Sequence, residues 1–194
     1  MYAMIGSSEA YKGKVCLLGD PAVGKTSLVR KFVLDQYSDD YIPTVGAKIT
    51  KKDVAVTTDA MKAEVSLMIW DINGQWDMFK ENLGQIERFK PPQRYYSLTN
   101  GALLVCDVTQ KETFAHLSRW YESLVTEIGV KVPAVLICNK SDLKGSAAVT
   151  DADITGLSHD MGFPFFYTSA KTGENVEAAF LTLSRMLLKV MMGP

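Results

Sequence analysis

The sequence has no long apolar run: nowhere do about eighteen consecutive apolar residues occur, the length that suggests a membrane-spanning helix. Cysteine is scarce as well. The three cysteines, Cys16, Cys106 and Cys138, each lie inside a short apolar run, which predicts buried thiols of a reducing compartment and not a disulfide or metal framework. The charge has no excess of either sign, since 21 basic and 22 acidic residues give a net charge of −1. This balance gives no reason to expect a nucleic-acid ligand.

Signals for export or lipid attachment are missing too. Residues 1–10 lack the basic and apolar blocks of a secretory signal, and Tyr2 stands where myristoylation needs glycine. The last residues, MMGP, offer no cysteine to a lipid. We therefore expect a cytoplasmic protein without a direct membrane anchor, in which residues 1–10 form a flexible tail and residues 11–194 form one domain.

Short apolar runs alternate with longer amphipathic segments along the chain. Strands are predicted at 15–18, 65–70, 102–107, 134–138 and 163–167, and helices at 25–34, 112–128, 151–161 and 176–191. This alternation is typical of an α/β fold whose mostly parallel sheet carries helices on both faces. The link between residues 47–56 and 64–70 is too short for a crossover helix. We therefore expect a hairpin there, which leaves one antiparallel strand at the edge of a six-stranded sheet.

The run GDPAVGKT at residues 19–26 is the most informative motif. It fills the phosphate-loop pattern G-x-x-x-x-G-K-[ST] between a predicted strand and a predicted helix. The glycines let the backbone wrap around phosphate oxygens, so that N–H groups and the positive end of the helix face the anion. Lys25 is expected to reach the β- and γ-phosphates, and the Thr26 hydroxyl to bind Mg²⁺. The expected phosphate contacts are Asp20, Ala22, Val23, Gly24, Lys25, Thr26 and Ser27.

A second motif, DING at residues 71–74, directly follows the predicted strand that ends at Trp70. In a phosphate-loop enzyme this is the place of a second acid linked to the metal. We expect Asp71 to hold Mg²⁺ through a water molecule, and the Gly74 N–H to meet the γ-phosphate.

Two further motifs predict a binding site for the base. NKSD at 139–142 follows a predicted strand, so its side chains emerge at the carboxyl end of the sheet, where open α/β folds bind ligands. Asp142 can accept hydrogen bonds from the guanine N1–H and 2-amino groups, a pair that adenine cannot supply, and this favours GTP over ATP. Asn139 is expected to brace the base and the loop, and the Lys140 stem to cover one purine face. In the later motif, Ser169-Ala170-Lys171, the Ala170 N–H is expected to donate to the guanine O6.

Taken in order, GDPAVGKT, YIPT, WDINGQ, NKSD and SAK resemble the Ras superfamily of small GTPases, and the details look closest to its Rab branch. The resemblance covers nearly the whole chain and implies a three-layer phosphate-loop NTPase domain, the G domain, that binds GTP or GDP with Mg²⁺. It also implies that Thr44 binds Mg²⁺ through its hydroxyl and the γ-phosphate through its N–H. By the same resemblance, Tyr37 lies against the base and ribose, and Tyr41 belongs to the nucleotide-binding first switch. Gln75, together with Lys25 and Thr44, is then a catalytic residue that orients the attacking water.

The second switch departs from the family pattern. Gln75 is followed by Trp76 where the family has an acidic residue, and the segment between Gln75 and Gly101 is longer than usual. Gln85 stands at the ordinary spacing before Gly101, so two glutamines compete for one role. We favour Gln75, because it keeps its register with Asp71. The insertion is either a partner-binding elaboration or a tolerated change of loop length.

Pro21 stands in the phosphate loop where the family commonly has glycine. It removes one N–H donor, and its ring would crowd an arginine from an activating partner; rigid packing without functional consequence is the other interpretation. We predict a monomeric switch that hydrolyses GTP slowly and meets effector, exchange-factor and activating proteins at its switch loops. The alternative is a GTP-binding scaffold that does not hydrolyse; an ATP-dependent kinase is a more distant possibility.

Overall fold

The computed structural model describes residues 10–38, 44–58, 62–74 and 93–193. In chain order its elements are β1 (Ala10–Leu18), α1 (Lys25–Leu34), β2 (Ala47–Thr57), β3 (Lys62–Ile72), α2 (Gln93–Tyr96), β4 (Gly101–Asp107), α3 (Lys111–Ala115), α4 (Leu117–Ile128), β5 (Ala134–Asn139), the 3-10 helix η1 (Ser141–Ser146), α5 (Asp151–Met161), β6 (Phe165–Tyr167) and α6 (Val176–Met192). In these described ranges, no helix is both long and apolar enough to cross a bilayer.

The six strands form one sheet in the order β2-β3-β1-β4-β5-β6. β2 runs antiparallel to β3 at one edge, and the other neighbours pair in parallel, which confirms the predicted fold class and the hairpin. β1 is longer than predicted, because β3 continues alongside it as far as the pair Ala10 and Glu64. The register also pairs Asp107 with Asn139, so that β4 and β5 end side by side. The residues that follow these strands are therefore delivered to one edge of the sheet.

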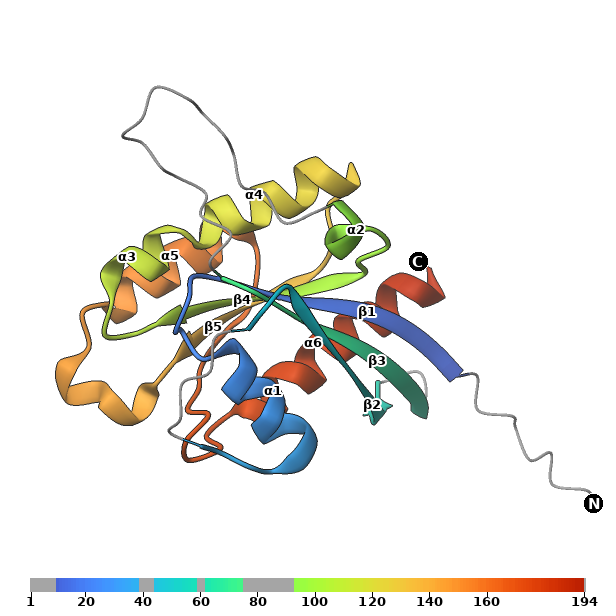
Figure 1. The fold of residues 1–194 in the computed structure, drawn as a ribbon. Helices are drawn as coiled ribbons and strands as arrows, with labels where there is room; N and C mark the ends of the chain where they lie inside the picture. The colour runs from blue at the N-terminus through green and yellow to red at the C-terminus, as the bar shows by residue number, and fades with distance from the viewer. Residues whose placement is uncertain (1–9, 39–43, 59–61, 75–92, 194) are drawn as a thin grey trace, which may run out of the picture.

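Helices cover both faces of the sheet, as Figure 1 shows: α1 and α6 lie on one side, and α3, α4 and α5 on the other. Successive side chains of each strand point to opposite faces of the sheet, so each face has its own apolar core, which packs against the helices that cover it. Cys16, Cys106 and Cys138 lie in the core beneath α4 and α5, and all three are buried and free, as predicted. Burial raises the pKa of the Cys16 thiol to about 11.

The predicted helix at residues 112–128 is in fact two helices, which is the main correction to the expected elements. α3 ends at Ala115, α4 begins at Leu117, and His116 lies between them as the capping residue of both. The sequence has neither proline nor glycine here to indicate an interruption. The short elements α2 and η1 were also not predicted, since so few residues show no periodicity.

Candidate nucleotide site

The phosphate loop leads from β1 into α1 as the motif predicts. Gly24 is the N-cap of α1, with φ of 100°, a left-handed conformation that glycine adopts at little cost. A side chain there would also collide with Asn139, because an added Cβ would lie 2.3 Å from its Nδ2. Ala22 has φ of 61° as well, although it carries a side chain. The left-handed backbone at Ala22 and Gly24 curves the loop, and a curved loop of this kind lets successive N–H groups face an anion.

A cavity of about 260 Å³ opens above this loop and the first turn of α1. Its walls come from the phosphate loop, α1, the segment before β2, the end of β3 and the loop after β5. The lining residues are Pro21, Ala22, Gly24, Lys25, Thr26, Ser27, Arg30, Tyr37, Ser38, Thr44, Ile72, Asn73, Gly74 and Lys140. Five of the predicted phosphate contacts line this cavity together with Thr44, Gly74 and Tyr37, whereas Asp20 and Val23 are not among its lining residues.

Lys25 is buried at the floor of the site. Its ammonium group donates to the carbonyl oxygens of Gly19 at 2.6 Å and Asp20 at 2.7 Å. Burial lowers the pKa of Lys25 to about 8, a shift that the negative charges of Asp71 and Asp20 oppose. A buried cation whose hydrogen-bond acceptors, among the described residues, are two carbonyls is well placed to bind a phosphate anion as a further partner.

Thr26, Thr44 and Asp71, the residues expected to hold Mg²⁺, lie together beside the N-terminus of α1. The Thr26 hydroxyl donates to Asp71 Oδ2 at 2.5 Å and lies 3.0 Å from the Thr44 hydroxyl oxygen. The other carboxylate oxygen, Asp71 Oδ1, is buried and has no hydrogen-bond partner among the residues that the structure describes. Burial raises the pKa of Asp71 against the hydrogen bond from Thr26 and the attraction of Lys25. Two hydroxyls and an unsatisfied carboxylate oxygen are hard oxygen ligands, and these residues therefore fit Mg²⁺ bound directly or through water.

Gly74 packs directly against the phosphate loop. An added Cβ at Gly74 would lie 2.5 Å from Asp20 C and from Pro21 N, and 2.6 Å from Asp20 O. These are backbone atoms, so a side chain here would push the loop and the end of the β3 segment apart. Glycine at this position keeps the second-switch backbone within reach of whatever the loop binds.

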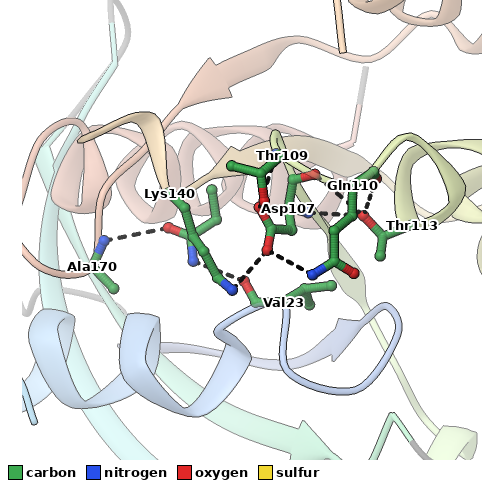
Figure 2. Close-up of polar contacts among 8 residues, drawn as sticks. Val23, Asp107, Thr109, Gln110, Thr113, Lys140 and Ala170 are labelled. Atoms are coloured by element: carbon green, nitrogen blue, oxygen red, sulfur yellow. Dashed lines mark hydrogen bonds and ion pairs between the residues drawn. The ribbon is translucent and has the colours of Figure 1, made fainter. Parts of the chain in front are cut away.

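Asn139 ties the phosphate loop to the base-binding loops. Its amide Nδ2 donates to Val23 O at 2.8 Å, and its Oδ1 accepts from Thr168 Oγ1 at 3.1 Å and from Ala170 N at 3.3 Å. The expected bracing of the loop by Asn139 is therefore present. In the structure the Ala170 N–H, which was predicted to meet the guanine O6, donates to Asn139, and Figure 2 shows Ala170 directed at that acceptor.

Lys140 has a partner that the sequence did not reveal. Its ammonium group pairs with the buried Asp107 carboxylate (Figure 2), and Lys140 Nζ lies 2.6 Å from Asp107 Oδ2. The same carboxylate also accepts from the backbone and hydroxyl of Thr109 and from Gln110. Lys140 has φ of 66°, so the backbone turns sharply after β5. The ion pair draws the stem of Lys140 along the wall of the cavity, which is compatible with its predicted place against the purine.

The other residues that were expected to bind the base contact one another between the NKSD and SAK loops. Asp142 is exposed and its Oδ1 accepts from Ser169 Oγ at 2.6 Å, while Ser141 Oγ donates to Glu174 at 2.6 Å. Two hydrogen bonds thus join the NKSD and SAK loops, although the sequence indicated no role for Glu174. Asp142, Ser169, Ala170 and Lys171 are not among the cavity-lining residues in the part of the chain that the structure describes.

The side chain of Asp20 also has partners that the sequence did not indicate. Its two carboxylate oxygens contact His116, between α3 and α4, at 2.7 Å and Trp120, on α4, at 2.9 Å. The sequence suggested a surface or partly buried His116 without a function; it is indeed partly buried, but it contacts the phosphate loop. The pair is 96 positions apart, and no local pattern joins its members.

Several predicted residues lie outside the described ranges. These are Tyr41 of the first switch, the competing glutamines Gln75 and Gln85, and Trp76. Their roles stay predictions. Of the expected catalytic residues, Lys25 and Thr44 are described, and both line the cavity.

Comparison with known proteins agrees with this geometry. The model of the family described as "Ras family" matches residues 14–189. The chain is similar to Ras-related protein RABA4b of Arabidopsis thaliana, at 36% identity over 89% of this chain and 71% of the relative. It is also similar to Ras-related protein RABA5a of the same plant, at 33% identity over 98% and 80%, and to Ras-related protein Rab11D of Nicotiana tabacum, at 34% over 89% and 72%.

Proposed function

The chain belongs to the Ras family, as a small GTPase of the Rab branch, and we propose that it binds GTP with Mg²⁺ and slowly hydrolyses it to GDP and phosphate. Family membership supports a guanine-nucleotide-dependent molecular switch with regulatory or effector partners. The metal, the slow turnover and the movement of two loops are the specific content of the proposal.

One observation carries the proposal: Thr26, Thr44 and Asp71 lie together next to Lys25, with Asp71 Oδ1 buried and unsatisfied. These residues come from α1, the segment before β2 and the end of β3. Together they would hold Mg²⁺, which would neutralise charge on the β- and γ-phosphate oxygens. A phosphate loop without a metal partner would not require the two hydroxyls to face one carboxylate.

The residues of this chain then account for the chemistry. Lys25 and the backbone N–H groups of the loop stabilise the charge that develops on the phosphate oxygens. Gln75 is proposed to orient the attacking water in line with the γ-phosphate. The proposal assigns no arginine of this chain to the transition state, so we expect slow unaided turnover.

The switch follows from two of the contacts. Thr44 and the Gly74 backbone are proposed to bind the γ-phosphate, and Gly74 already packs on the phosphate loop. Loss of that phosphate would free both segments, and the loops around them would relax. Effector, exchange-factor and activating proteins would distinguish the two states, and we propose that the chain acts as a monomer in the cytoplasm.

Selection of guanine is assigned to Asp142, which the Ser169 hydroxyl holds in place. The test is displacement of a fluorescent GDP from the purified protein by GTP and by ATP. We expect GTP to displace the probe at concentrations at least about a hundredfold lower than ATP, because adenine leaves the carboxylate unpaired. Equal displacement by the two nucleotides would contradict this assignment.

Hydrolysis is tested by single-turnover phosphate release from bound GTP. Pro21, which supplies no N–H to the phosphate cavity that it lines, favours the alternative of a GTP-binding scaffold that does not hydrolyse. Release above the rate of free GTP supports the GTPase; release equal to that rate, with GTP still bound, supports the scaffold.

The two glutamines are separated by the same assay. We expect Gln75→Leu to slow phosphate release strongly, while Gln85→Leu leaves it close to the original rate. The opposite pattern would assign the water-orienting role to Gln85.

A further inference from the structure

The Asp20 carboxylate links the phosphate loop to α4 and to the junction of α3 and α4. Trp120 Nε1 donates to Asp20 Oδ1 at 2.9 Å, and His116 Nδ1 lies 2.7 Å from Asp20 Oδ2. An ionised carboxylate only accepts hydrogen bonds, so the imidazole must carry a proton on Nδ1. Trp120 is buried in the core under α4, which makes it a fixed anchor for the loop.

The backbone of Asp20 carries contacts on which the site depends. Its carbonyl oxygen accepts from the ammonium group of Lys25 at 2.7 Å. Its carbonyl group and the adjoining Pro21 nitrogen are also the atoms that pack against Gly74. Whatever fixes the Asp20 side chain therefore fixes the position of Lys25 and the fit between the phosphate loop and the second switch.

The Asp20 carboxylate is bound on the side of the helices, by residues of the α3–α4 junction and of α4. A negative side chain in a loop that binds phosphate would repel its ligand if it faced the cavity. Asp20 is not among the described residues that line the cavity, whereas its neighbours Pro21 and Ala22 are. Hydrogen bonds from His116 and Trp120 thus hold the carboxylate toward the helices.

We infer that Asp20, His116 and Trp120 form a clamp that positions the phosphate loop and slows the release of bound nucleotide. His116 and Trp120 are positioning residues, which act through Asp20 on Lys25 and on Gly74. The inference rests on the proposed binding of guanine nucleotide and adds a control of its lifetime from the junction of α3 and α4. That junction is interrupted at His116 itself, so the helix break places the imidazole at the loop.

The experiment measures the release of fluorescent GDP after addition of excess unlabelled GDP, with Mg²⁺ present. We expect His116→Ala to speed release by about tenfold, the effect of one lost hydrogen bond to a charged group. His116→Asn should restore slow release, since the Asn amide nitrogen can occupy nearly the place of Nδ1. Trp120→Phe, which removes the N–H but keeps an aromatic ring in the core, should also speed release. His159→Ala is the matched control, because His159 is exposed and pairs with its neighbour Asp160.

A double-mutant comparison distinguishes a clamp from general loss of stability. In an Asp20→Ala background, His116→Ala should change the release rate no further, because its partner is gone. Release by His116→Ala at the original rate, or an undiminished effect in the Asp20→Ala background, would overturn the clamp. If the unmodified protein binds no GDP at all, the proposed function itself fails, and the two failures are therefore distinguishable.

Discussion

Replacement of Asn139 by alanine tests the connection between the phosphate loop and the base loops. The change deletes three hydrogen bonds at once, to Val23 O, Thr168 Oγ1 and Ala170 N. Asn139 is buried, so water cannot readily replace these bonds. We expect Asn139→Ala to lower both the stability of the fold and the affinity for GDP.

The size of the effect follows from the number of bonds. A net value of about 1 kcal/mol for each buried hydrogen bond gives a loss of about 3 kcal/mol in the free energy of unfolding. For a domain of this size, that loss lowers the unfolding midpoint by about 6 to 12 °C. If about half of this free energy is lost from the nucleotide-bound protein in addition to what the free protein loses, the affinity for GDP falls by about tenfold.

The assay is thermal unfolding of the nucleotide-free protein, combined with a GDP titration. Asn100→Ala is the matched control: Asn100 makes one exposed side-chain hydrogen bond, to the Lys14 N–H at 2.8 Å, and should cost less than about 1 kcal/mol. Equal shifts for the two variants would refute the reasoning, because burial and bond number would then not determine the cost. A large loss of stability with unchanged GDP affinity would show that the brace does not act on the nucleotide site.

Three further predictions concern the phosphate side of the site. In competition titrations, Gly74→Ala should weaken GTP binding by about tenfold more than GDP binding, because the added Cβ would push the second switch away from Asp20 and Pro21. Equal losses for the two nucleotides would contradict a γ-phosphate contact. Lys25→Met should abolish nucleotide binding but stabilise the nucleotide-free protein at pH 7. Burial lowers the pKa of Lys25 from 10.5 to about 8, so the folded state holds fewer protons between these values. The advantage of Lys25→Met in unfolding midpoint should therefore shrink from pH 8 to 10.5, and a constant gap would be inconsistent with this cause. Asp71→Asn should lower the affinity for the metal by about ten- to a hundredfold. A metal chelator should therefore accelerate GDP release much less in this variant than in the unmodified protein.

Local patterns were sufficient to predict the sheet and the phosphate loop. The helix at residues 25–34 has the predicted bounds, and the hairpin places β2 at the sheet edge. Thr26, Thr44 and Asp71 lie together in the structure. Thr26 and Asp71 were identified from motifs that adjoin a strand or a helix, whereas Thr44 was expected from the family resemblance, and the metal role of all three stays a prediction. Such signals depend on residues close in sequence and on the edge of the sheet to which parallel strands point.

Contacts between distant polar side chains could not be predicted in the same way. The pairing of Asp20 with His116 requires the exact end of α3, and an uninterrupted amphipathic pattern hides that end. Lys140 was expected against the purine, but its choice of Asp107 depends on a left-handed backbone turn after β5. Long side chains can reach many partners, and the backbone geometry that selects one of them is not visible in the sequence.

Because the three cysteines are buried, thiol reagents should not react with the folded protein. Cys16, Cys106 and Cys138 have no exposed surface in the structure, and they are all the cysteines that the chain contains. Their modification rate in solution would therefore report the opening of the sheet itself. A single cysteine introduced on a switch loop would be the one reactive thiol of the native molecule, so a dye placed there would follow the nucleotide cycle without background labelling.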